Sequence, residues 1–252
     1  MKHTLRRIIY PIRKLAAKFV NVNSIAYGNS IIHKAATLVA SEGIEGDYLE
    51  FGVCAGGTFI NSYQVIKAVF KHHEKFYAQQ TKENAAKTRR IGENMRFFAF
   101  DSFQGLPELD RIDSETSNFV PGKYACEESR FRENLVNADV PLDRVVTVAG
   151  WFKDTCTEET RRKHAMEKAA IIYVDCDLYA SARTVLDFVR PLLTDGTIII
   201  FDDWYCFRGN PNRGEQRAFN EWKATMTDWT FTEYQKEGPW RNSFIANKCN
   251  SD

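Results

Sequence analysis

Short apolar segments alternate with longer helix-like segments from residue 47 onward, and this alternation limits the chain to few folds. The apolar segments are rich in Val, Ile and Phe: DYLEFGV (47–53), RFFAFDSF (96–103), RVVTVAG (144–150), AAIIYVD (169–175) and TIIIFDD (197–203). Helix-like spacing marks TFINSYQVIKAVFKHH, EESRFRENLVNA, TEETRRKHAMEK and SARTVLDFVRPLL between them. Strands separated by helical crossovers predict an α/β fold, with a parallel sheet and helices on both faces.

The last fifty residues predict a different kind of strand pair. After a helix in GEQRAFNEWKATM, two further strands, TFTEYQ and NSFIANK, flank the turn KEGPWR. Such a pair forms a hairpin that closes one edge of the sheet. The polar stretch 71–95 is predicted to be a helix tail followed by a surface loop.

Composition indicates the cellular compartment and the number of domains. The 252 residues are 44% hydrophobic, enough for one large domain with an N-terminal attachment. Six cysteines are scattered without a CxxC pair, which favours a reducing, cytoplasmic location. No apolar run approaches the roughly 20 residues of a membrane span, and no signal peptide is recognisable.

The N-terminal segment is basic. Residues 1–41 contain seven Lys and Arg and no acid, so they carry +7, whereas the remainder carries −6. We therefore expect a basic helical segment over 1–44 and a catalytic domain over 45–252. Residues 1–20 have the pattern of an amphipathic helix that packs on its own domain, on a second copy, or on an anionic membrane surface.

Acids and glycines gather where the predicted strands end, at Glu50, Gly52, Gly56, Gly57, Asp101, Gly150, Asp175, Asp177, Asp202 and Asp203. In open α/β sheets the ligand crevice lies at this carboxyl edge. The glycines in EFGVCAGGT allow a ligand to approach the backbone closely, and an acid such as Asp101 can accept hydrogen bonds from ribose hydroxyls. Together they favour an adenosine-containing ligand, although a tight turn and a helix cap would explain each one alone.

The motifs YVDCD and FDDW predict a metal site. Asp175, Asp202 and Asp203 on neighbouring strand ends would repel one another unless a hard cation lay between them, and Mg²⁺ prefers such oxygen ligands. Helix capping would explain one acid at each strand end, but not the doublet of Asp202 and Asp203. Asp177 lies near enough to take a proton from an acceptor hydroxyl.

These motifs together resemble one enzyme family. LEFGVCAGGT, FAFDSFQGLPE, GKYAC, VAGWFKDT, IIYVDCDLYASARTVLDFVRPLL and GTIIIFDDW are similar to segments of the macrocin O-methyltransferase family, over roughly residues 45–247. Members are Mg²⁺-dependent sugar O-methyltransferases that use S-adenosylmethionine. The resemblance implies a class I methyltransferase fold, a Rossmann-like, mostly parallel sheet of seven strands whose last strand is antiparallel.

The resemblance also implies roles for individual residues. Glu50 and the glycine loop would face the methionine part of the donor, Asp101 the ribose, and Gly150 to Phe152 the adenine. Asp175, Asp202 and Asp203 would hold Mg²⁺, with Asp177 as general base. The full set expected to bind the donor is Glu50, Phe51, Gly52, Gly56, Thr58, Asp101, Ser102, Gly150, Trp151, Phe152 and Asp175.

The expected acceptor is a small molecule or glycan with vicinal hydroxyls, and no nucleic-acid partner is expected. Arg208, Arg213 and Arg217 either contact an anionic acceptor or belong to a solvated loop. Two alternatives remain at this point. One is a metal-dependent glycosyltransferase that uses the DCD acids for a nucleotide sugar, and the other is a donor-binding protein without catalysis.

Overall fold

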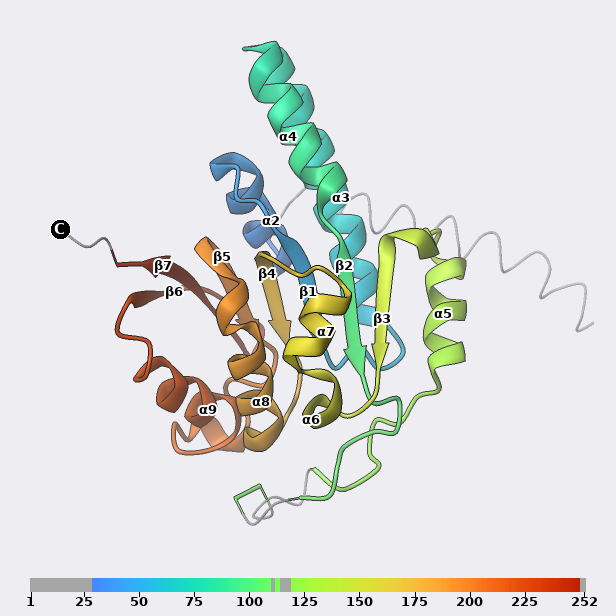
Figure 1. Ribbon diagram of the computed structural model, residues 1–252, viewed down its shortest axis with the longest axis vertical. Coiled ribbons are helices and arrows are strands. Elements are labelled where there is room, and N and C mark those ends of the chain that lie inside the picture. Colours follow the sequence, from blue (N-terminus) through green and yellow to red (C-terminus); the bar gives the residue numbers. More distant parts are fainter. Residues whose placement is uncertain (1–28, 110–111, 114–118, 250–252) are drawn as a thin grey trace, which may run out of the picture.

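The computed structural model describes residues 29–109, 112–113 and 119–249 (Figure 1). A single sheet contains β1 (Asp47–Phe51), β2 (Phe97–Asp101), β3 (Val145–Ala149), β4 (Ala169–Val174), β5 (Leu193–Phe201), β6 (Trp229–Glu237) and β7 (Arg241–Lys248). The α-helices are α2 (Ile31–Glu42), α3 (Gly57–Ala78), α4 (Lys82–Asn94), α5 (Glu128–Asn137), α6 (Phe152–Thr155), α7 (Glu158–Lys163), α8 (Tyr179–Val189) and α9 (Gly214–Lys223). The basic helix predicted over residues 1–20 lies outside the described residues.

The strand order confirms the predicted fold class. The sheet runs β3-β2-β1-β4-β5-β7-β6, with β7 antiparallel to β5 and the first five strands parallel. The predicted hairpin exists, and its second strand is the one that pairs with β5. The chain reverses its direction of winding between β1 and β4, so their carboxyl ends form the crevice where such sheets bind ligands.

β1, β2, β4 and the last five residues of β5 are buried on both faces, which explains their largely hydrophobic sequences, whereas the edge strand β3 is only partly buried. Tyr48, Phe97 and Ile198 pack with α2, α3 and α5 on one face. Leu49 and Ile199 pack with α8 and α9 on the other. Successive strand residues thus alternate between two cores, as the two-residue period of a strand requires.

The helix tail predicted in residues 71–95 is confirmed, but the predicted surface loop was wrong, because this stretch contains a second full helix. α3 continues to Ala78, and α4 returns beside it, so that the pair projects beyond the amino-terminal edge of the sheet (Figure 1). Only Ala85, Thr88, Ile91 and Gly92 of α4 are buried. This stripe is narrow and made of small side chains, so polar residues conceal it in the sequence.

Two other segments depart from prediction in detail. The helix predicted in TEETRRKHAMEK ends at Lys163, and a short helix, α6, precedes it. α2 contributes six buried residues to the core, although the predicted boundary at residue 44 assigns it to the N-terminal segment.

Arg96 joins three segments at the amino-terminal edge of the sheet. Its guanidinium pairs with Asp47 at 2.6 Å and donates to the carbonyl oxygens of His164 and Ala165. The start of β1 is thereby tied to the turn that precedes β4. Among the described residues, no helix has both the length and the apolar character needed to cross a bilayer.

Candidate active site

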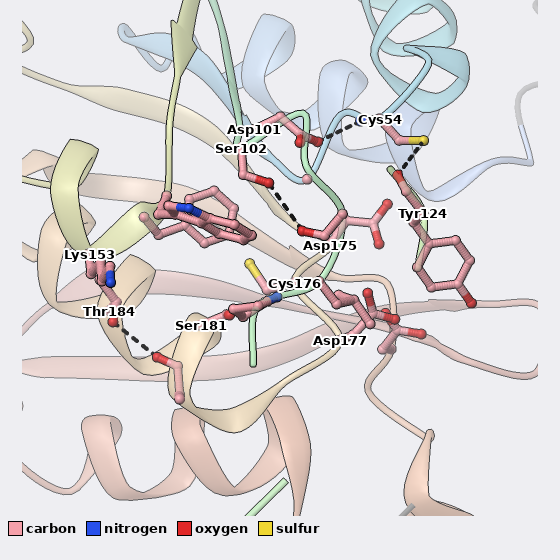
Figure 2. Close-up of a pocket in the computed structure, with 18 of the residues that line it drawn as sticks. Cys54, Asp101, Ser102, Tyr124, Lys153, Asp175, Cys176, Asp177, Ser181 and Thr184 are labelled. Carbon is pink, nitrogen blue, oxygen red and sulfur yellow. Dashed lines mark hydrogen bonds between the residues drawn. The ribbon is translucent and has the colours of Figure 1, made fainter. Parts of the chain in front are cut away.

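A cavity of about 820 Å³ opens at the carboxyl ends of the parallel strands (Figure 2). Nine of the predicted site residues line it: Gly52, Asp101, Ser102, Trp151, Phe152, Asp175, Asp177, Asp202 and Asp203. They come from the ends of β1 to β5, so the sheet itself brings them together.

Gly52 lets β1 and β4 approach each other at the crevice. Its φ is 97°, and a Cβ at this position would lie 1.8 Å from the carbonyl oxygen of Asp175. Only glycine fits both the backbone conformation and this close approach. The glycine predicted to admit a ligand therefore also sets the distance between two strand ends.

The carboxylate of Asp101 organises the loops on either side of it. It accepts backbone N–H bonds from Cys54 at 2.7 Å and from Phe103 at 2.7 Å. Burial raises the pKa of Asp101, so these donors serve to hold the ionised form. Each carboxylate oxygen has a second lone pair, which leaves Asp101 able to accept from a ligand in the cavity.

Glu50 lies beneath the cavity rather than on its wall. The side chain is fully buried and accepts a hydrogen bond from the Tyr48 hydroxyl. Its other oxygen, Oε1, is buried and has no hydrogen-bond partner. Burial raises the pKa of Glu50 to about 8. An unsatisfied buried oxygen is costly, so this atom fits a site that a donor group of a ligand completes.

The remaining residues predicted to bind the donor divide into two groups. Trp151 and Phe152, which follow β3, line the cavity beside Lys153. Phe51 is a core residue, stacked on Phe100. Gly56, Thr58 and Gly150 do not line the cavity but lie in the turns that shape it.

Three carboxylates converge at the ends of β4 and β5. Oxygens of Asp175, Asp177 and Asp203 lie within 4.8 Å of one another, the one such group among the described residues. Burial and the neighbouring acids raise the pKa of Asp175, and burial and Asp203 raise that of Asp177 to about 8. Asp177 also has a left-handed φ of 59°, a strained conformation typical of functional sites. Such a cluster needs protons or a cation, and its all-oxygen donor set suits Mg²⁺.

Asp202 lines the same cavity but has a different neighbourhood. Its Oδ1 accepts from Arg241 Nε at 2.6 Å and from the Tyr173 hydroxyl. Both contacts fall on one oxygen, so they fix the orientation of the carboxylate while Oδ2 is the oxygen that can turn toward an ion. The structure therefore brings Asp175 and Asp203 together as predicted, adds Asp177, and holds Asp202 beside them.

Sequence reasoning missed the other residues of the cavity wall, which come from loops and from two helices. The loop residues are Cys54, Gly105, Leu106, Pro107, Glu108, Tyr124 and Cys176, and the helix residues are Lys153 of α6 and Ala180, Ser181 and Thr184 of α8. Leu106 pairs with Gly122 and Lys123 through backbone hydrogen bonds, which places Tyr124 over the cavity. The buried Asp113 accepts from the N–H groups of Tyr179 and Ala180 and so joins the same loop to α8. The motifs QGLPE and GKYAC were the signal for the part of the wall formed by Gly105 to Glu108 and Tyr124.

The arginines after the acid doublet do not line the cavity. Arg213 donates to the carbonyl oxygen of Ile112 at 3.1 Å. Arg217 pairs with Glu221 at 2.7 Å and lies over the Tyr179 ring. These contacts favour the interpretation that Arg213 and Arg217 hold loops and helices together.

Comparison with known proteins places this site in a family. Curated relatives include a tetracenomycin 4'-O-methyltransferase of Streptomyces olivaceus, 29% identical over 171 residues, and the mycinamicin III 3''-O-methyltransferase of Micromonospora griseorubida, 28% identical over 177 residues. Each match covers 66% of this chain but only 56% and 57% of the relatives. The chain thus spans little more than half of their length.

Solved structures share the fold. The O-methyltransferase NovP superposes with a TM-score of 0.60 at 19% identity, over 86% of this chain and 78% of that one. The calicheamicin methyltransferase CalS11 gives 0.59 at 21%, over 85% and 76%. An O-methyltransferase of Bacillus cereus, in complex with SAH, gives 0.52 at 17%, over 91% and 88%.

A family profile covers most of the chain. Residues 29–228 match the family described as macrocin-O-methyltransferase (TylF), a span that includes α2, all five parallel strands and the acids at their ends. The glycosyltransferase alternative loses its support. The chain therefore belongs to the macrocin-O-methyltransferase (TylF) family.

Proposed function

We propose that this protein is an O-methyltransferase that transfers the methyl group of S-adenosylmethionine to a hydroxyl of a sugar or another small vicinal diol. Family membership supports the reaction class, and one curated relative is named for O-methylation of a compound that carries a rhamnosyl group. The observation that carries the proposal is the shared cavity, which Gly52 and Asp101 line together with the acid cluster.

The donor would lie along the ends of β1, β2 and β3. Asp101 would accept from the ribose hydroxyls, and Trp151 with Phe152 would pack against the adenine. The unpartnered Oε1 of Glu50 would accept from the amino group of the methionine part. Phe51, Gly56, Thr58, Ser102 and Gly150 would shape this half, and the solved relative from Bacillus cereus supports it by its complex with SAH.

Asp175 and Asp203 would hold Mg²⁺, with Asp177 or Asp202 as the third carboxylate. A bound Mg²⁺ would supply positive charge that lowers the pKa of an acceptor hydroxyl. Asp202 would serve through Oδ2, with its orientation fixed by Arg241 and Tyr173.

Asp177 would act as the general base. Burial and Asp203 give its carboxylate a pKa of about 8, closer to neutrality than that of a free aspartate, which suits proton abstraction. Asp177 would take the proton from the acceptor hydroxyl, and the sulfonium donor would supply the methyl group to that oxygen, with its own sulfur as the leaving group. The products would be a methyl ether and S-adenosylhomocysteine.

The experiment that tests the proposal is a transfer assay with a panel of sugar acceptors, read by S-adenosylhomocysteine release. We expect turnover with at least one vicinal diol, its loss in EDTA, and recovery with Mg²⁺. Asp177→Asn should lower turnover by at least about 100-fold, in keeping with the loss of a general base. Asp187→Asn is the control, because Asp187 is an exposed residue of α8 paired with Arg183.

Metal titration separates the two candidates for the third ligand. We expect Asp175→Asn and Asp203→Asn to abolish Mg²⁺ binding in calorimetry. Of Asp177→Asn and Asp202→Asn, the one that weakens binding more identifies the third carboxylate. Mg²⁺ affinity that stays unchanged in all four variants would remove the metal from the proposal while leaving methyl transfer to be judged by the assay.

Three further expectations accompany this function. A cytoplasmic location is supported by the free state of all six cysteines. Membrane contact of residues 1–20 and assembly into a homo-oligomer concern surfaces that include residues outside the described ranges. Both stay predictions.

A further inference from the structure

Glu215 is a buried acid in an acidic surrounding. It lies in the first turn of α9 with 1% of its surface exposed. The charged groups that face it are Asp203, Asp175 and Asp202, all negative. A carboxylate in such a place is costly unless its oxygens have partners.

Both oxygens of Glu215 accept backbone N–H bonds, one from each of the loops that carry the acid cluster. Oε2 accepts from Asp203 N at 3.0 Å, and Oε1 accepts from Cys176 N at a longer 3.4 Å. Cys176 stands between Asp175 and Asp177. One side chain thus connects the loop after β4 with the loop after β5.

The surroundings of α9 support the same role. Gln216, the next residue and also buried, donates to the carbonyl oxygen of Trp204 at 2.6 Å. A Cβ on Gly214 would lie 3.5 Å from the Asp177 carbonyl oxygen. The amino-terminal turn of α9 therefore packs directly beneath both acid-bearing loops.

We propose that Glu215 is a positioning residue that sets the separation between Asp203 and the pair Asp175 and Asp177. The two N–H donors reach different oxygens, so a carboxylate accepts from both, whereas a Gln amide would set its NH₂ group against one of them. The inference rests on the proposed metal-dependent function, and it assigns to α9 the task of holding the carboxylates at the spacing a divalent ion requires. Residues that orient metal ligands typically change metal affinity 10–100-fold when altered.

The test compares Glu215→Gln with Glu221→Gln, an exposed acid on the same helix that pairs with Arg217. After EDTA treatment and dialysis, calorimetry measures the affinities for Mg²⁺, Mn²⁺ and S-adenosylhomocysteine. We expect Glu215→Gln to lower the affinity for both ions at least about tenfold. The affinity for S-adenosylhomocysteine should change less than twofold. Glu221→Gln should match the parent. An ion affinity within twofold of the parent would overturn the proposal, and so would an equal loss of nucleoside binding, which indicates general damage.

Amide hydrogen exchange gives a readout that needs no metal. In ion-free Glu215→Gln, either the amide of Asp203 or that of Cys176 faces the glutamine NH₂ group and loses its acceptor. At least one of these two amides should exchange at least about tenfold faster, with the β4 and β5 amides unchanged. If the parent binds neither ion, the metal part of the proposed function fails, and unchanged exchange at both amides then overturns the role of Glu215 as well. Should Glu215→Gln not fold, Glu215→Asp replaces it, because its shorter stem withdraws both oxygens. Parent-like ion affinity in that variant contradicts the proposal.

Discussion

At the scale of single residues, the site depends on positions that accept only one type of residue. Gly52 combines a left-handed φ with a backbone contact that excludes a Cβ, and Asp101 holds the N–H groups of two different turns. Neither residue acts only on a ligand. Each one also fixes the backbone that forms the cavity.

Gly52→Ala should therefore damage both stability and binding. The added Cβ would meet the Asp175 carbonyl oxygen at 1.8 Å, so the ends of β1 and β4 must separate. We expect the free energy of unfolding to fall by about 3 kcal/mol or more, because backbone strain is one of the few causes of losses this large. Urea denaturation measures it.

Gly57→Ala is the matched control, because a Cβ there meets nothing within 4 Å. Gly57 begins α3, where alanine has the better helix propensity. Parent-like stability of Gly52→Ala would show that the two strand ends can move apart freely.

The residue scale also shows where sequence reasoning ended. The acids at the strand ends could be predicted because each follows an apolar run. Glu215 could not, since its partners are backbone N–H groups that no sequence pattern displays. The neighbourhood of Asp202 depends on Arg241, which lies 39 residues away on the antiparallel strand.

At the scale of elements, an ion pair joins the first two strands at the amino-terminal edge of the sheet. Asp47 is nearly buried, and Arg96 is its partner across β1 and β2. Arg96→Ala leaves that charge unpaired, so we expect the free energy of unfolding to fall by about 3 kcal/mol. Thermal or urea denaturation measures the change.

Arg90→Ala provides the comparison, because Arg90 pairs with Glu45 where both side chains are at least half exposed. Exposed pairs contribute about 0–1 kcal/mol, so this variant should be close to the parent. Equal effects of the two substitutions would contradict the role assigned to Arg96.

The hydrophobic pattern of the sequence predicts some elements and misses others. β4 is a continuous apolar run and was placed correctly. In β5 the apolar run from Ile198 to Phe201 was found, but the strand begins earlier than predicted, at Leu193. α4 was hidden because its buried stripe consists of Ala85, Thr88, Ile91 and Gly92, too small and too narrow for a hydrophobic period. The family resemblance gave seven strands with an antiparallel last strand, whereas the strand order came only from the structure, since local patterns do not say which strands are neighbours.

At the scale of the whole molecule, the buried acids couple stability to pH. Asp177 and Glu50 have pKa values of about 8 in the folded chain, against model-peptide values near 4. Between pH 4 and 8 the folded state therefore binds more protons than the unfolded state. Stability contributed by these groups is complete below about pH 4 and is lost as pH rises toward about 8.

Because stability falls as pH rises, a prediction follows for the protein in EDTA. Its melting temperature should fall as pH rises from 6 to 8.5, because the acids of the cluster ionise against one another. If the cluster holds Mg²⁺ as proposed, the ion would bind the folded state in competition with those protons, so 10 mM MgCl₂ should raise the melting temperature more at pH 8.5 than at pH 6. Differential scanning fluorimetry checks it, and an equal shift at both pH values would count against ion binding by this cluster.

The α3–α4 pair, which projects beyond the amino-terminal edge of the sheet, lies at the opposite edge from the cavity (Figure 1). Its connection at Gln79 and Gln80 is exposed. Exposed loop tips tolerate insertions and attached groups well. The molecule can thus be tethered to a bead or an electrode through this turn, with the mouth of the cavity left open to the surrounding solution.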